Sequence, residues 1–342
     1  MEKLLVLTHV DGSGAALSKA SLESVAAGVE MAAALGAPLV IGILGAQPAS
    51  AAKELAGTGA RILAVSDDAF AQPRYASDAA ALEALVRAAE ATIVFAPASS
   101  RFARVMPGVA YRLGGFVDTH ITSVAKAETL EATRWYYRQR VEAVVKRESR
   151  PWFLLLEAGT HAPWIATGSA SEVESISVTL PNLRTTVSGI KAPRQDEQTI
   201  RPEAKILFVA GAGWTKKQAD GAVHAAEAEQ LILGFLRAAD ASLGSSKSLV
   251  DQSGENQAVL KFMTHMNQIG QTGATPRHPK GLSTCCHGEE PHVVGWRFIG
   301  DRRAISLDPN CGWTRGKADV VYVADAFPVM AKLNALLEAK KA

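Results

Sequence analysis

Residues 3–10, KLLVLTHV, are followed at 17–36 by LSKASLESVAAGVEMAAALG and at 38–45 by PLVIGILG. The first and third segments are short apolar runs, which predict buried strands. The middle segment has helical spacing and ends on Gly36, a common helix stop. Strand, helix and strand in this order predict a parallel sheet covered by helices.

The same rhythm continues toward residue 99. ARILAVS (60–66) and TIVFAPAS (92–99) predict further strands, ALEALVRAAE (81–90) predicts a helix, and we expect an alanine-rich helix between residues 45 and 60. From about 116 to 178 the pattern changes. FVDTHITSVA, TRWYYRQRVEAVV and PWFLLLEAG carry aromatic and β-branched residues without intervening helices, which predicts antiparallel strands added to the edge of the sheet.

A second α/β unit follows a polar, proline-punctuated linker. The linker spans residues 181–204, so we expect domains at 1–180 and 205–342. KILFVAGAG (205–213) predicts a strand that ends in a Gly-x-Gly turn, and a long alanine-rich helix is expected to run to about 242. Four more strands and a terminal amphipathic helix are then expected, at 243–252, 292–300, 303–308, 319–325 and 327–342.

Composition bounds the class of protein. The chain has 342 residues, 48% of them apolar and 20% charged, which is typical of a soluble globular protein with more than one domain. A net charge of +2 gives no general attraction to nucleic acid or membrane. We see no apolar run of about 18 residues, no signal-peptide cleavage site, and only three cysteines. We therefore expect a cytoplasmic protein without membrane insertion.

The loop QIGQTG at 268–273 follows the helix-like segment AVLKFMTHMN (258–267). Its two glycines permit close approach to the main chain, and Gln271 and Thr272 between them offer donors and acceptors to a polar ring edge or a phosphate. Taken alone, G-x-x-G is also an ordinary turn.

Seven segments, taken in order, resemble the alpha subunit of electron-transfer flavoproteins. QIGQTG matches the flavin-loop motif of that family fully, and from Gly270 the register continues without gaps. The other similar segments are HVDGSGAALSKASLE (9–23), APASSRFARVMPGVAYRLGGFVDTH (96–120), VAGAGW (209–214), LGSSKSLVDQSG (243–254), ISLDPN (305–310) and ADVVYVADAF (318–327).

The resemblance implies a fold and a function. The fold is two α/β domains: an N-terminal adenine-nucleotide-hydrolase-like parallel sheet with added antiparallel strands, and a C-terminal doubly wound FAD-binding domain. The function is electron transfer by FAD from a donor dehydrogenase to an acceptor that reduces the quinone pool, in a heterodimer with a beta subunit. The basic and aromatic segment at 134–147 then corresponds to an interface strand rather than a nucleic-acid site.

The resemblance also assigns flavin contacts. Gly211 and Gly213 are candidates for the pyrophosphate, although a tight strand-to-helix turn explains them equally. Lys247 stands where the family has an arginine over the flavin ring; lysine keeps the charge but loses the planar guanidinium. The flavin loop supplies Gln271 and Thr272 to the ring edge near N5 and O4. The remaining loop residues are Ile269, Gly270 and Gly273.

Further contacts follow from the same register. His292 aligns with a family histidine near flavin O2, where a donor favours negative charge on the reduced ring. His287 and Gly288 belong to the loop before it. Ser306, Asp308 and Asp319 match the adenosine and ribose side of FAD; either aspartate alternatively caps a turn.

Departures from the family pattern keep two alternatives open. Ala212 replaces an arginine, and Glu289 with Glu290 place two carboxylates at a phosphate-binding loop, which favours a flavin-free structural subunit. Leu307 and Val320 also differ from the residues that the family has at these positions. The second alternative is a metal or iron–sulfur carrier that uses Cys285, Cys286 and Cys311 with His287 and His292. Adjacent cysteines point apart and no C-x-x-C spacing exists, so buried, inert cysteines are the competing interpretation.

Overall fold

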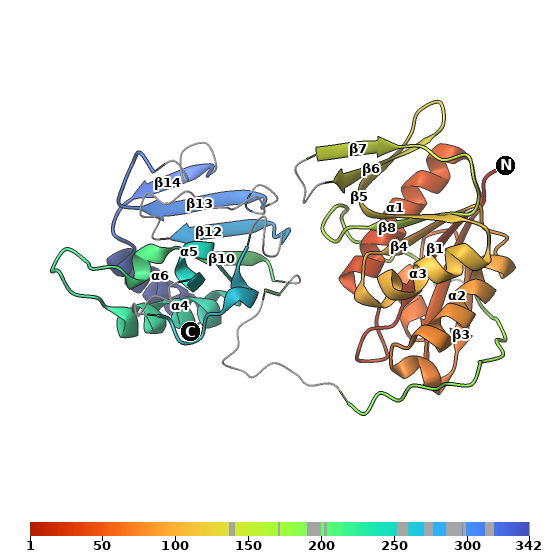
Figure 1. The fold of residues 1–342 in the computed structure, drawn as a ribbon, viewed down its shortest axis with the longest axis horizontal. Helices are drawn as coiled ribbons and strands as arrows, with labels where there is room; N and C mark the ends of the chain where they lie inside the picture. Colours follow the sequence, from red (N-terminus) through yellow and green to blue (C-terminus); the bar gives the residue numbers. More distant parts are fainter. Residues whose placement is uncertain are drawn as a thin grey trace. The chain divides into compact units, whose positions relative to one another are not determined.

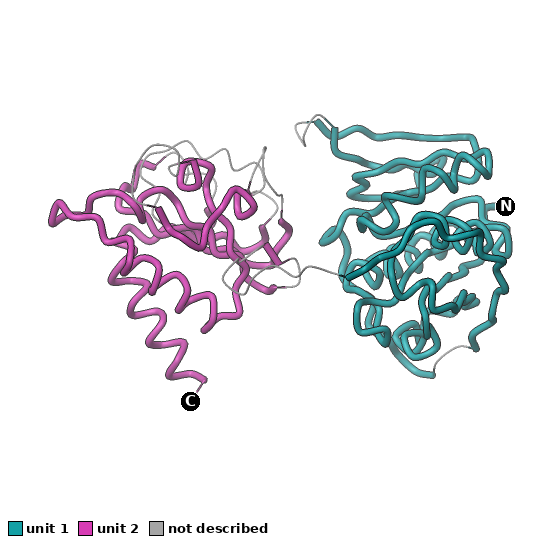
Figure 2. The backbone as a smooth tube through the Cα atoms, turned by 60° about the horizontal axis from the view of Figure 1, so that its bottom comes forward, with its two compact units in different colours: residues 1–190 teal, residues 191–342 magenta. Residues whose placement is uncertain are grey.

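The computed structural model describes residues 1–136, 141–169, 172–189, 200–201, 204–251, 259–269, 276–284, 296, 299–311 and 318–341. The chain divides into two compact units, Met1–Ile190 and Lys191–Ala342 (Figure 2). Each unit is an α/β domain built on its own sheet (Figure 1). The predicted fold class is therefore confirmed.

The described residues of unit 1 form a nine-stranded mixed sheet in the order β7-β6-β5-β8-β4-β1-β2-β3-β9. Strands β5, β6 and β7 pair antiparallel at one edge, as expected, and we call them the antiparallel extension. The strands are β1 (Leu4–His9), β2 (Leu39–Gly45), β3 (Arg61–Ser66), β4 (Ile93–Pro97), β5 (Phe116–Lys126), β6 (Leu130–Tyr136), β7 (Val141–Val145), β8 (Trp152–Leu156) and β9 (Val173–Ser175).

The expected antiparallel direction of PWFLLLEAG was wrong. Strand β8 pairs in parallel with both β4 and β5. All five of its residues are buried. A strand inside a sheet that is covered on both faces needs apolar side chains on both, and WFLLL supplies them.

Helices cover both faces of this sheet. Helix α1 (Lys19–Leu35) packs into the core of one face, while α2 (Tyr75–Ala88) and α3 (Ser100–Arg112) pack into the core of the other. Helix α1 ends as predicted at Gly36, which adopts the left-handed φ of 62°. The helix expected between 45 and 60 is only the short 3₁₀ turn η1 (Ala51–Leu55). A second 3₁₀ turn, η2 (Asp68–Ala71), precedes α2.

The described residues of unit 2 form a five-stranded parallel sheet in the order β11-β10-β12-β13-β14. Its strands are β10 (Ile206–Ala210), β11 (Ser242–Ser245), β12 (Lys280–Thr284), β13 (Asp301–Ser306) and β14 (Val320–Val323). Helices α4 (Ala225–Ala239) and α6 (Ala326–Lys341) pack together against one face. The other face has a smaller core around Leu207, Val209, Ile269 and Trp296.

Several expectations for unit 2 need correction. The strand expected at 243–252 ends at Ser245, and helix α5 (Lys247–Asp251) follows, because Ser246 Oγ accepts the Leu249 N–H at 3.3 Å. Among its described residues, the segment before the flavin loop is helical only at the 3₁₀ turn η5 (His265–Asn267). The helix expected to run to 242 is α4, which begins only at Ala225. Most of the strand expected at 292–300 lies outside the described residues.

None of the described helices is both long and apolar enough to span a bilayer.

Candidate functional site at the carboxyl edge of unit 2

The strand order of unit 2 creates a switch point between β10 and β12. The chain leaves β10 to form β11 on one side of it, and β12 lies on the other side. In open parallel α/β sheets, ligands bind beyond the carboxyl ends of the strands at such a point. We call this side of the sheet the carboxyl edge, and it is the candidate site.

The Gly211-Ala212-Gly213 turn follows β10 at this edge. The Gly211 N–H donates to the Thr284 carbonyl at 2.9 Å, so the turn is joined to β12. The 3₁₀ turn η3 (Ala212–Thr215) is buried, and Trp214 Nε1 donates to Thr284 Oγ1 at 2.8 Å. These contacts give the turn a packing role, and contact of Gly211 and Gly213 with a pyrophosphate stays a prediction.

The flavin loop begins beside the carboxyl end of β11. Ser245 forms a parallel bridge with Gln268, and the Ile269 N–H donates to the Ser245 carbonyl at 3.1 Å. Ile269 is buried in the smaller core of unit 2. Ser245 Oγ is buried and has no hydrogen-bond partner among the described residues. A buried hydroxyl normally has a partner, and contact of Ser245 Oγ with a ligand stays a prediction.

A cation also lies at this edge. Lys247 is the first residue of α5, and its Nζ contacts the carboxylate of Asp251. On the other side of that carboxylate, His265 Nε2 lies 2.9 Å from Asp251 Oδ1. Hydrogen bonds from Lys247 and His265 lower the pKa of the Asp251 carboxyl. Asp251 therefore holds Lys247 next to the start of the flavin loop.

The turn after β13 is organised by Asp308. Its Oδ1 accepts the Asn310 N–H at 2.8 Å, and its carbonyl accepts the Cys311 N–H at 3.2 Å. Ser306 is buried, and its Oγ donates to the Asp308 carbonyl at 3.2 Å. Both predicted residues lie at the carboxyl edge, and Asp308 also caps the turn.

The structure does not bring Asp319 to this edge. Asp319 precedes β14 and therefore lies at the amino end of the sheet, where Arg302 Nη2 contacts its Oδ1 at 2.8 Å. The Arg302 N–H donates to its Oδ2 at 2.8 Å. Hydrogen bonds from Arg302 lower the pKa of the Asp319 carboxyl.

The aspartate at the carboxyl end of β14 is Asp325, which sequence reasoning missed. Its Oδ1 accepts the Phe327 N–H at 2.9 Å, at the start of α6. The signal was present in the sequence, since an aspartate between an apolar run and a helical pattern is a typical N-cap.

Half of the predicted site residues lie outside the described residues. They are Gly270, Gln271, Thr272, Gly273, His287, Gly288 and His292. Cys285 and Cys286 lie outside as well, while Cys311 is buried. In the part of the chain that the structure describes, no group of three or more His, Cys, Asp or Glu side chains is arranged to hold a metal ion.

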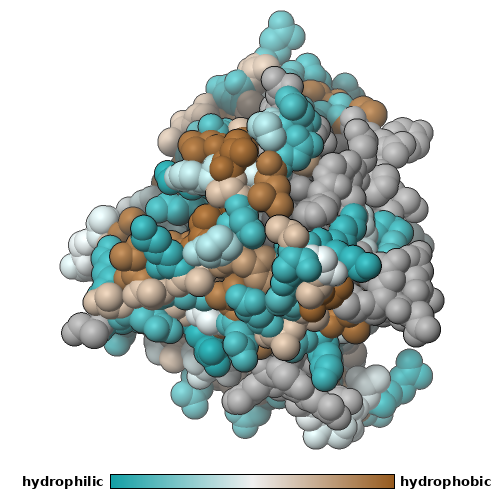
Figure 3. All heavy atoms as spheres, turned by 90° about the vertical axis from the view of Figure 1, so that its left-hand side faces the viewer, coloured by the Kyte–Doolittle hydropathy of each residue, from teal (hydrophilic) through white to brown (hydrophobic). Residues whose placement is uncertain are grey.

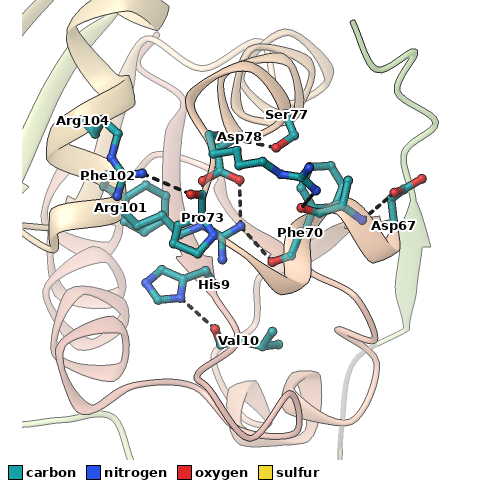
Figure 4. Close-up of polar contacts among 12 residues, drawn as sticks. His9, Val10, Asp67, Phe70, Pro73, Ser77, Asp78, Arg101, Phe102 and Arg104 are labelled. Atoms are coloured by element: carbon teal, nitrogen blue, oxygen red, sulfur yellow. Dashed lines mark hydrogen bonds and ion pairs between the residues drawn. The ribbon is translucent and has the colours of Figure 1, made fainter. Parts of the chain in front are cut away.

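Side chains of unit 1 contact one another at the corresponding edge of its sheet. The switch point there lies between β1 and β4, and Arg101, near the start of α3, reaches back over it (Figure 4). Arg101 donates to both carboxylate oxygens of Asp78, at 2.7 and 2.8 Å, and to the Phe70 carbonyl at 3.0 Å. The His9 ring lies against Phe102 at a centroid distance of 5.3 Å.

Comparison with known proteins identifies the family. The sequence model described as "Electron transfer flavoprotein domain" matches residues 6–181, just over half of the chain. The chain belongs to the electron transfer flavoprotein family. The electron transfer flavoprotein subunit alpha of Clostridium acetobutylicum is 26% identical over 333 residues, which cover 94% of each chain.

For an electron transfer flavoprotein, the extent of these matches is informative. The family match lies within unit 1, whereas the similarity to the clostridial subunit alpha runs through both units. The resemblance to electron transfer flavoprotein alpha subunits is thereby confirmed, and the low identity makes this chain a divergent member.

Proposed function

We propose that this chain is the FAD-carrying alpha-type subunit of an electron transfer flavoprotein. It would pair with a beta-type subunit and pass electrons from a dehydrogenase to an acceptor that reduces the quinone pool. The observation that supports this most is the similarity to a subunit alpha through 94% of both chains. A shared fold in unit 1 alone would not support a flavin site in unit 2.

Three features of the described part of the carboxyl edge support a flavin site there. They are the buried Ser245 hydroxyl, the Lys247 cation and the turn around Asp308. The positive end of α6 and the Asp325 carboxylate lie at the same edge. By resemblance, Gln271, Thr272 and His292 would complete the site. When bound, FAD would supply reversible uptake of electrons, which no side chain of this site provides.

The side chains of the site would act on the flavin ring through their charges. Lys247 would favour negative charge on a reduced ring, and Asp251 would moderate that effect because it already pairs with Lys247. Trp214 and Ile269 are buried next to the carboxyl edge, so water does not reach these two side chains. Asp325 follows β14 and lies at the carboxyl edge, whereas Asp319 precedes β14. This position favours Asp325 over Asp319 as the carboxylate that would bind the ribose of FAD.

Co-expression with a beta-type subunit tests the proposal. The purified heterodimer should contain about one FAD, identified by its absorbance and by chromatography after release. Thr272→Ala and His292→Ala should weaken FAD retention, and so should Ser245→Ala, which removes the unpartnered hydroxyl. A stable heterodimer that takes up no FAD would instead support a structural subunit.

A further inference from the structure

Unit 2 contains a pocket of about 590 Å³ at the amino end of its sheet, away from the carboxyl edge. It lies between the sheet face and helices α4 and α6. Its walls are mostly apolar and include Ile206, Phe235, Leu282, Ile305, Leu333 and Leu337. The volume is within the range of about 300–1,000 Å³ that is usual for small-molecule sites.

The pocket exists because α6 packs on the sheet through its first half only. Phe327 and Met330 are buried in the core, whereas Leu333 and Leu337 are only partly buried and Leu336 is 60% exposed. Small residues, Ala239 on α4 and Gly281 on β12, line the same space. In the space-filling view of unit 2, hydrophobic side chains reach the surface in separate groups among hydrophilic ones (Figure 3). Leu333 and Leu337 keep part of their apolar surface open beside the pocket, which favours an apolar ligand.

Charged residues line the pocket on the helix-facing side of the sheet. A parallel sheet covered by helices normally carries apolar residues on both faces, so their position is unusual. Arg303 Nε lies 3.4 Å from Asp301 Oδ1, and Arg303 Nη1 donates to Tyr322 Oη at 3.2 Å. The hydrogen bond to Asp301 raises the pKa of Arg303, which stays charged. With Lys280 and Lys332, the pocket has three cations and one carboxylate.

We propose that this pocket binds a single-chain amphiphile with an anionic head group, such as a long-chain fatty acid. The chain would occupy the apolar walls, and the carboxylate would lie at Arg303 with Lys280 and Lys332 nearby. A nucleotide suits the pocket less well, because most of the lining is apolar and the polar groups are charged side chains rather than partners for a base or sugar. The excess of cations likewise favours an anionic head over a neutral one.

Palmitate binding to the purified heterodimer tests the proposal. Displacement of the fluorescent fatty acid cis-parinaric acid would be measured for palmitate and for hexadecanol, which lacks the charge. Arg303→Gln should weaken palmitate binding about fivefold and remove the preference over hexadecanol. The matched control is Arg302→Gln: Arg302 is the neighbouring residue on β13, is absent from the pocket lining and pairs with Asp319. It should leave binding within about twofold.

A second variant, Leu333→Trp, should fill the pocket and abolish palmitate binding without loss of secondary structure. The proposal is overturned if palmitate shows no saturable displacement, if Arg303→Gln and Arg302→Gln behave alike, or if hexadecanol binds as well as palmitate. It is also overturned if a photo-crosslinker at position 336 captures the beta-type subunit and the heterodimer binds no palmitate, because the pocket is then a protein interface. None of these measurements depends on FAD.

Discussion

At the residue scale, unit 1 contains a charge pair in its interior. The side chains of Arg101 and Asp78 are only 9% and 1% exposed, and their contact is bidentate. Burial of two charges has a large desolvation cost, which the pairing and the Phe70 carbonyl offset. Such a pair contributes little net stability, but loss of one partner leaves an uncompensated charge.

We therefore expect Arg101→Met to lower the free energy of unfolding by about 3–5 kcal/mol. The double variant Asp78→Asn with Arg101→Met should recover part of that loss. Arg87→Met is the control, because Arg87 pairs with Glu83 at the surface and should cost at most about 1 kcal/mol. Urea unfolding measures all three, and equal losses in Arg101→Met and Arg87→Met would contradict the buried-pair account.

His9 makes the stability of unit 1 depend on pH. Burial lowers the pKa of His9 below 6.5; its Nδ1 lies 2.8 Å from the Val10 carbonyl, and its Nε2 is buried without a partner among the described residues. The folded state therefore resists protonation, whereas the unfolded state takes up a proton near pH 6.5. Stability is then lost as pH falls through this range, by at most about 1.4 kcal/mol per pH unit.

The test is denaturant unfolding of the wild type and His9→Asn between about pH 7 and about pH 5. In His9→Asn the free energy of unfolding should fall less steeply as pH falls. Some of the fall should remain, because burial also lowers the pKa of His161. Parallel curves for the two proteins would show that His9 does not carry the effect.

At this scale the sequence register predicted the position of some residues along the sheet but not of others. Ser306 and Asp308 lie at the carboxyl edge as the register implies. Asp319 and Asp325 flank the same short strand, and only the direction of β14 shows that Asp325 is the one at that edge. A local pattern does not show which end of a sheet a residue occupies.

At the element scale, the antiparallel extension is fixed to unit 1 through Asp118. This buried carboxylate accepts hydrogen bonds from Arg134 at 3.0 Å, from Arg147 at 2.9 Å and from Trp152 Nε1 at 2.9 Å. Burial alone raises the pKa of Asp118, but the hydrogen bonds from Arg147 and Trp152 bring it below its ordinary value. These hydrogen bonds join β6, the segment after β7 and β8 to Asp118 on β5, so the antiparallel extension is held in place by side chains as well as by strand pairing.

We propose that the beta-type subunit binds the antiparallel extension at β7. Among the described strands β7 pairs only with β6, and Val144 on it is 59% exposed. Val144→Lys should weaken assembly about tenfold, because burial of a valine contributes about 1.5–3 kcal/mol. Analytical ultracentrifugation measures the effect.

The control for this prediction is Tyr111→Lys, an exposed apolar residue on α3. Both variants should keep the unfolding free energy of unit 1 within about 0.5 kcal/mol of the wild type. Equal assembly of the two variants would exclude β7 from the interface.

Apolar elements were predictable from sequence, and polar ones were not. The runs that became β1, β2, β3 and β4 have unbroken apolar cores. Strand β12 reads KGLST and was missed, although it lies at the centre of its sheet. Its neighbours supply the pairing that its own residues do not indicate, since tertiary context overrides local preference.

At the scale of the whole molecule, each unit has its own cores. Unit 1 has one core on each face of its nine-stranded sheet, and unit 2 has the same arrangement around its smaller sheet. Residues 1–189 expressed alone should therefore fold cooperatively, with a single unfolding transition in circular dichroism and calorimetry. A fragment without cooperative unfolding would show that unit 1 depends on the rest of the chain.

The proposed function depends on FAD binding at the carboxyl edge of unit 2. The most direct measurement is the FAD content and FAD affinity of the heterodimer, compared between Asp325→Asn and Asp319→Asn. Asparagine preserves the cap of α6, so Asp325→Asn should not disturb folding. We expect about one FAD per heterodimer, weaker binding in Asp325→Asn and unchanged binding in Asp319→Asn. A heterodimer that stays colourless after FAD is added, or flavin lost only in Asp319→Asn, would contradict this expectation.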